Sequence, residues 1–206
     1  MNGFFIGKFN LPPIIVTLAT SSVFMGIAIF WMPIPGGSLP LSIAKFLTKN
    51  IGFISVPALL FLGITILSWY FLKYTQIGRN IYTIGGSEQV AIRVGINVCQ
   101  TKLFTYTTAG IIASIAGMYL TARMYCADTS IGAPFIMDSI AIAVIGGTSL
   151  AGGQGGVFGI VAGAFIINLL NNLLNMLGIS SFYQYIMKGI ILIIALSISS
   201  ARKNSP

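Results

Sequence analysis

The sequence predicts an all-α, polytopic membrane protein, a helical bundle of about six membrane segments. Hydrophobic residues make up 56% of the 206 residues and charged residues only 7%, with a mean hydropathy of +0.94. Soluble domains carry about 25% charged residues, so a chain this poor in charge is expected to lie in a lipid bilayer. Apolar runs of about 20 residues, the length that a helix needs to cross the bilayer, also recur along the chain.

The six apolar runs differ in length and in their flanking residues. The first follows Pro12 and Pro13, which a helix tolerates in its first turn because the missing N–H group would have no partner there. The fourth is shorter, contains Asp138 and ends in a glycine-rich sequence, which leaves open whether it crosses fully. We predict membrane segments at about 11–32, 53–72, 103–122, 135–150, 157–177 and 182–200.

The positions of the basic residues favour six crossings. Cytoplasmic loops of membrane proteins are enriched in lysine and arginine. If Lys8 is cytoplasmic, two crossings return the chain to that side at the basic segment 73–102, and six return the basic C-terminal tail. A segment 135–150 that failed to cross would place the tail on the opposite side. Lys45 and Lys49 fall on the wrong side and oppose this topology.

The composition argues against several classes of function. The net charge of +8 comes from 11 basic and 3 acidic residues, but no basic cluster is interleaved with aromatic residues, so nucleic-acid binding is not expected. The chain has no histidine, and Cys99 and Cys126 form no paired metal-binding motif. No nucleophile stands beside a base, so we predict that the chain is not an enzyme and has no cofactor or metal.

The segment 73–102 is the largest polar stretch of the chain. The glycine pair 85–86 predicts a break, after which Ser87 is a suitable N-cap and Glu88 suits the positive end of a helix dipole. Gly95 then ends a helix of about two turns, which is too short to be stable alone in water. The residues leave two interpretations open: a connector that lies on the membrane surface, or a docking element for a soluble partner.

A glycine-rich element, GGTSLAGGQGG, spans residues 146–156. It has neither the lysine of a phosphate-binding loop nor the preceding strand of a dinucleotide-binding turn. Small residues favour tight connections and close helix packing, and Gly155, Gly159 and Gly163 continue at four-residue spacing. Packing is the favoured interpretation, and a conformational hinge is the alternative. The candidate packing or hinge residues are Gly146, Gly147, Gly152 and Gly153.

Four asparagines stand in the apolar sequence NLLNNLLN, residues 168–175. On a helix they share one face, because they occupy positions i, i+3, i+4 and i+7, and the leucines take the other face. A face of amides is not expected to meet lipid. It either forms hydrogen bonds between helices or gives an uncharged polar lining to a path for a hydroxyl-rich solute. The residues are Asn168, Asn171, Asn172 and Asn175.

Few charged residues lie near the predicted membrane segments. Arg123, Asp128 and Asp138 stand at or beyond the end of the third segment and the start of the fourth. A charge inside a bilayer costs ~2.5–3.5 kcal/mol and invites a functional interpretation, but a structural ion pair near the interface is equally well supported. Lys188 is predicted to extend outward toward the membrane surface.

Several of these motifs together resemble one protein family. They are GRNIYTIGGSEQVAIRVGINV (residues 78–98), MDSIAIAVIGGTSLAGGQGGVFGIVAGAFI (137–166) and LLNNLLNMLGISSFYQYIMKGIILIIA (169–195), preceded by NGFFIGKFNLPPIIVTLAT (2–20). In this order they resemble the permease subunits of bacterial ABC importers for monosaccharides of the ribose, xylose, arabinose and galactose type. The resemblance covers nearly the whole chain.

The resemblance implies a transmembrane pathway subunit of an ATP-driven sugar importer in the bacterial plasma (inner) membrane. The implied partners are a second permease subunit, cytoplasmic ATP-binding subunits that hydrolyse the ATP, an extracytoplasmic sugar-binding protein and membrane lipid. The loop at about 73–102 matches the family's ATPase-coupling region, which favours the docking interpretation. The implied coupling residues are Gly78, Arg79, Gly85, Gly86, Glu88, Ala91, Arg93 and Gly95.

The resemblance also implies a protein of about ten membrane segments. We therefore expect residues 1–206 to be part of one permease transmembrane domain, with helices missing before Met1. The alternative function is a truncated or non-transporting membrane fragment of such a permease. A secondary transporter is less well supported, because ion-coupled carriers place charged residues in mid-membrane.

Overall fold

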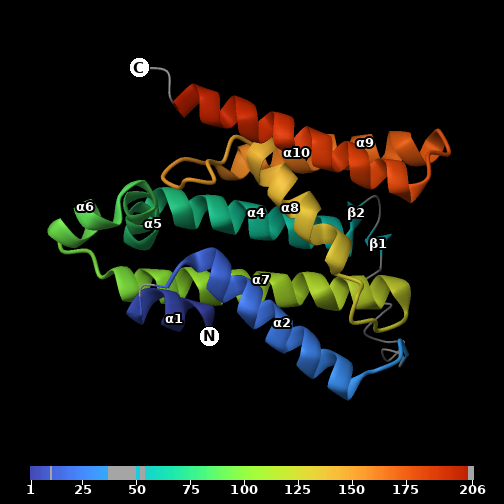
Figure 1. Cartoon of the computed structure of the whole chain (residues 1–206), viewed down its shortest axis with the longest axis horizontal. Coiled ribbons are helices and arrows are strands. Elements are labelled where there is room, and N and C mark those ends of the chain that lie inside the picture. The colour runs from blue at the N-terminus through green and yellow to red at the C-terminus, as the bar shows by residue number, and fades with distance from the viewer. Residues whose placement is uncertain (10, 37–49, 52–53, 204–206) are drawn as a thin grey trace. The chain divides into compact units, whose positions relative to one another are not determined.

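The computed structural model describes residues 1–9, 11–36, 50–51 and 54–203 (Figure 1). Lys45, Lys49 and Phe53, which enter the predicted topology, lie outside these ranges. The elements in chain order are α1 (Asn2–Lys8), α2 (Pro13–Trp31), β1 (Asn50–Ile51), β2 (Ile54–Ser55), α4 (Val56–Tyr74), α5 (Gln76–Gly86), α6 (Glu88–Arg93), α7 (Val98–Met124), α8 (Ala133–Ile145), α9 (Val157–Met176) and α10 (Ser181–Lys203).

Four of the described helices are long and apolar enough to cross a membrane: α2, α4, α7 and α9. Helix α8 is apolar but has only 13 residues. Helix α10 has 23 residues and is not among the four. The chain is a multi-pass membrane protein, and the predicted all-α polytopic bundle is confirmed.

The ends of the helices follow local capping. Helix α9 begins at Val157 and ends at Met176, almost as the apolar run predicts. Helix α7 begins at Val98, earlier than its apolar run, because Asn97 accepts a hydrogen bond from the backbone N–H of Gln100 at 3.1 Å and caps a polar first turn. Helix α8 ends before its predicted limit, since Gly147 follows in the left-handed region with φ 78°.

Hydroxyl groups within the apolar helices bond to the backbone of their own helix. Thr20 donates to Val16 O at 2.8 Å, and Thr105 donates to Thr101 O at 2.8 Å. Ser114 does the same with Gly110 O at 2.9 Å. In a bilayer no water is present to satisfy such groups, so this pattern lets threonine and serine stand in membrane helices at small cost.

One compact unit comprises Met1–Ile81 and Glu88–Gly132. Within it, α1 packs antiparallel against the first turns of α7: Gly3 lies against the backbone of Leu103, and Gly7 lies against Cys99. A Cβ atom at Gly3 would lie 2.7 Å from Leu103 Cα, so a side chain there would separate the two helices. Strands β1 and β2 form a short antiparallel pair.

A sharp turn joins α4 to α5 in the same unit. Thr75 stands between the helices in an extended conformation; its hydroxyl donates to Phe71 O at 2.6 Å and accepts from the N–H of Gly78 at 3.1 Å. A Cβ atom at Gly78 would collide with the backbone of Leu72, including its carbonyl oxygen. Glycine at position 78 therefore allows α5 to fold back closely against the end of α4.

The second compact unit comprises Tyr82–Ser87 and Ala133–Pro206. Helix α8 packs against both α9 and α10. The α8–α9 contact is made by backbone atoms: a Cβ atom at Gly146 would lie 2.6 Å from Gly159 O, and one at Gly163 would lie 2.5 Å from Ile142 O. Gly146, directly after α8, and Gly159 and Gly163 of α9 therefore bring the two helices together without intervening side chains.

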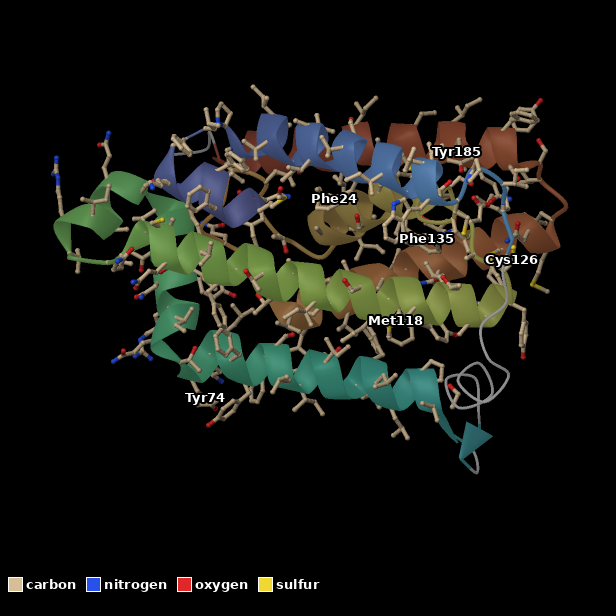
Figure 2. All side chains as sticks on the ribbon, turned by 90° about the horizontal axis from the view of Figure 1, so that it is seen from below. Phe24, Tyr74, Met118, Cys126, Phe135 and Tyr185 are labelled. Atoms are coloured by element: carbon tan, nitrogen blue, oxygen red, sulfur yellow. The ribbon has the colours of Figure 1, made fainter. Side chains whose placement is uncertain are left out.

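Large apolar side chains are exposed along the helices. Phe24 of α2, Tyr74 at the end of α4 and Met118 of α7, which are labelled in Figure 2, are each more than half exposed. In water such surfaces would cause aggregation, whereas in a bilayer they are suited to contact with lipid or with neighbouring helices.

Candidate functional site

The predicted coupling segment folds into two short helices, α5 and α6. The glycine pair at positions 85 and 86 does not break α5, as the sequence suggested; both residues belong to its last turn, and the break falls at Ser87. Gly95 has φ 82° and ends the turn after α6. The predicted helix of about two turns after Ser87 is therefore present as α6. It is preceded by α5, a helix that the sequence analysis did not predict.

An ion pair attaches α6 to α7 within the first unit. Lys102 Nζ donates to both carboxylate oxygens of Glu88 at 2.8 Å, and the Lys102 side chain is 16% exposed. Ala91 is fully buried. Glu88 therefore holds α6 to α7. A charge reversal at Glu88 would disrupt this attachment, so its effect could not be assigned to partner docking alone.

The end of α6 and the residue that follows it are exposed in the described structure. Ile92 is 59% exposed and Val94 is 71% exposed, and Arg93 between them is exposed as well. Arg79, the basic residue at the start of α5, is also exposed. An exposed apolar edge at Ile92 and Val94, with a basic residue between them, is typical of a surface that a soluble partner covers.

The glycine-rich element meets the end of α5 within the second unit. Tyr82 Oη donates to Gly155 O at 2.9 Å. A Cβ atom at Gly85 would lie 2.7 Å from Gly153 N, and one at Gly153 would lie 2.8 Å from Gly86 Cα. Two motifs that the sequence analysis singled out separately thus lie side by side. Local sequence signals could not show this, because the contact joins residues 73 apart in the chain.

The asparagine face of α9 is largely uncovered in the described structure. Ile167 and Leu174 are buried, while Asn168, Asn172 and Asn175 are exposed and Asn171 is half-buried. By helical periodicity the amides stand beside the packed face of α9.

The four amides differ in their hydrogen bonds. Asn168 donates to Ala164 O of its own helix at 2.9 Å. Asn175 accepts from Gln184 of α10 at 2.9 Å, which is an interhelical bond of the kind that one interpretation foresaw. The side chains of Asn171 and Asn172 bond to nothing within the part of the chain that the structure describes.

An ion pair between α8 and α10 corrects the expectation for Lys188. The lysine does not extend outward: its Nζ lies 2.8 Å from Asp138 Oδ1 and donates to Oδ2 at 3.0 Å. The two side chains are 17% and 14% exposed. Lys188 Nζ also lies 5.8 Å from the ring centre of Tyr185, which is labelled in Figure 2. In this position the carboxylate of Asp138 offsets part of the cost of removing the lysine charge from water.

Asp128 follows α7 in the first unit and makes a local turn. It accepts hydrogen bonds from the backbone N–H and the hydroxyl of Ser130, both at 2.8 Å. These bonds favour the charged form and hold the pKa of the carboxyl below its ordinary value. The acid thus stabilises the loop beyond α7, and Arg123 is an exposed residue in the last turn of that helix.

Comparison with known proteins places the chain among membrane permeases. A family model described as "Branched-chain amino acid transport system / permease component" matches residues 1–196. The ribose import permease protein RbsC of Bacillus subtilis (strain 168) is 40% identical over 197 residues, which cover 94% of this chain and 61% of that protein. The xylose transport system permease protein XylH of Haemophilus influenzae is 42% identical over 160 residues, or 78% and 43% of the two chains.

A third relative is also a sugar permease. The D-allose transport system permease protein AlsC of Escherichia coli (strain K12) is 33% identical over 201 residues, which cover 96% of this chain and 61% of that protein. No solved structure matches the chain. By these coverages, the chain spans less than two thirds of the length of the three sugar permeases. With a family model that covers nearly all of its residues, it belongs to the family of transport-system permease components.

Proposed function

We propose that this chain forms part of the transmembrane pathway of an ATP-driven monosaccharide importer in the bacterial inner membrane. The observation that carries the proposal is the similarity to ribose, xylose and allose permeases along most of the chain. The asparagine face supports it, because uncharged amides exchange hydrogen bonds readily with the hydroxyl groups of a neutral sugar.

The proposal assigns different roles to α9 and to the α5–α6 segment. Helix α9 would contribute Asn171 and Asn172 to the lining over which the sugar passes. The α5–α6 segment would dock a cytoplasmic ATPase subunit through its open apolar edge at Ile92 and Val94. A second permease subunit would complete the pathway, and an extracytoplasmic binding protein would deliver the sugar. ATP hydrolysis would belong to the ATPase subunits.

The double variant Asn171→Leu/Asn172→Leu is expected to abolish sugar uptake while the complex still assembles. The leucines remove the polar lining, and the neighbouring contacts of α9 with α8 through Gly159 and Gly163 remain. The measurement is ATP-dependent uptake of labelled ribose, xylose and galactose by proteoliposomes that hold the chain, the ATPase and the binding protein.

The matched control for this experiment is Asn171→Gln/Asn172→Gln, which keeps both amides and is expected to retain uptake. Failed assembly of the leucine variant would show that the amides serve helix association instead. Absence of ATP-dependent uptake with the unaltered chain, in a complex that does assemble, would contradict the pathway function and favour a non-transporting membrane fragment.

Replacing the open edge of α6 with charge, in Ile92→Asp/Val94→Asp, is expected to weaken ATPase binding by about 30- to 1,000-fold, because apolar anchors at an interface each contribute about 1–2 kcal/mol. Both side chains are more than half exposed, so the isolated chain should keep its stability. Co-purification and titration of the ATPase onto the detergent-solubilised chain measure the effect. The control is Ile92→Val/Val94→Ile, and equal binding by both double variants would exclude this edge as the docking surface.

A further inference from the structure

Four glycines bring the end of α5 and the loop between α8 and α9 into backbone contact. We name Gly85, Gly86, Gly152 and Gly153 the glycine junction. A Cβ atom added at Gly152 would collide with the carbonyl oxygen of Gly85, and one at Gly85 would lie 2.7 Å from Gly153 N. No side chain stands between the two segments at these points, so neither can shift toward the other without moving it.

On the loop side of the glycine junction, hydrogen bonds within the loop stabilise its conformation. Gly152 and Gly153 adopt φ 89° and 76°, in the left-handed region that suits glycine. Ser149 N–H donates to Gln154 O at 3.0 Å, and Gly152 N–H donates to Ser149 O at 3.0 Å. Two hydrogen bonds within six residues make this loop a compact turn that moves as one piece.

Tyr82 adds a directional link beside the glycine junction. Its hydroxyl donates to Gly155 O at 2.9 Å, and Gly156, the next residue, is the N-cap of α9. Tyr82 therefore holds the last residues before the helix that carries the asparagine face.

The α5 side of the glycine junction leads directly to α6. Residues Tyr82–Ser87 belong to the same compact unit as α8, α9 and α10, whereas Glu88 and the rest of α6 belong to the other unit. Ser87 is thus the covalent link between α6 and a segment that packs against the α8–α9 loop.

We infer that Tyr82 and Gly85 are positioning residues that transmit movement of the α5–α6 segment to α9 through the glycine junction. The inference rests on the proposed function, in which α6 docks the ATPase and α9 lines the pathway. It assigns to the glycine-rich element a transmitting role, beyond the close packing of α8 on α9.

The test compares Tyr82→Phe and Gly85→Ala with Gly117→Ala in the reconstituted complex. Gly117→Ala is the control, because Gly117 is a helical glycine outside the junction and a Cβ atom there meets nothing within 4 Å. Sugar uptake and ATP hydrolysis are measured in the same proteoliposomes. We expect Tyr82→Phe to lower the uptake per ATP hydrolysed by about 3- to 10-fold, Gly85→Ala to lower it further, and Gly117→Ala to leave it unchanged.

A second measurement does not depend on transport. Hydrogen exchange of the backbone amides of residues 149–154 is followed before and after the ATPase and a non-hydrolysable ATP analogue are added. The exchange is expected to change in the unaltered chain and in Gly117→Ala, and to change much less in Gly85→Ala.

The two measurements separate the inference from the proposed function. If the complex showed no sugar uptake while Gly85→Ala still removed the exchange response, that result would support transmission through the glycine junction and contradict the transport function. The inference would be overturned if the unaltered complex takes up sugar and all three variants match it. They would match it in the ratio of uptake to ATP hydrolysis and in the exchange response.

Discussion

Asp138→Asn is expected to lower the free energy of unfolding by about 3–5 kcal/mol, because it leaves the ammonium group of Lys188 in an apolar surround without its partner charge. Both side chains of the pair are less than one fifth exposed, so water cannot replace the carboxylate. The measurement is denaturation of the chain in mixed detergent micelles, followed by helical circular dichroism.

Removing both charges at once is expected to have a much smaller effect. In Asp138→Leu/Lys188→Met no buried charge remains, and apolar replacements of buried ion pairs are often neutral or stabilising. If Asp138→Asn were as stable as the unaltered chain, the pair would not hold α8 to α10. If the double replacement were as unstable as the single one, shape rather than charge would explain the loss.

Gly159→Ala is expected to separate α8 from α9 and to lower the free energy of unfolding by about 1–3 kcal/mol, the usual cost of overpacking. The added methyl group would collide with the carbonyl oxygen of Gly146, a backbone atom that no rotamer change can move away. Alanine gains about 0.5–1 kcal/mol over glycine within a helix, which offsets only part of this cost.

The control for Gly159→Ala is Gly117→Ala in α7, where a Cβ atom meets nothing within 4 Å. That variant is expected to be as stable as the unaltered chain or slightly more so. Thermal denaturation midpoints of the two variants in the same detergent decide the question. Equal midpoints would contradict the close backbone contact between α8 and α9.

The sequence predicts those features that depend on neighbouring residues. The limits of α9 follow from one continuous apolar run after Gly156. The start of α7 does not, because its first turn contains Gln100 and Lys102 and depends on the cap at Asn97. Hydropathy reflects how a whole run of side chains prefers apolar surroundings, whereas a helix cap depends on a single hydrogen bond.

Features that join distant residues could not be predicted in this way. A glycine pair at positions 85 and 86 favours a break, since glycine loses more conformational freedom than other residues in a helix; in the structure both remain helical and lie against Gly152 and Gly153. The partner of Lys188 was missed for a similar reason. Charge and length suggested a reach toward water, and only the packing of α8 on α10 brings Asp138 close to the lysine.

The ion pair between α8 and α10 constrains how the protein is made. Asp138 leaves the ribosome 50 residues before Lys188, so α8 is complete while its only ion-pair partner in the described chain is still to be synthesised. A lone charge in the bilayer costs ~2.5–3.5 kcal/mol. We therefore expect stable insertion of the short helix α8 to wait for α10, so that the last three helices enter the membrane as one unit rather than one after another.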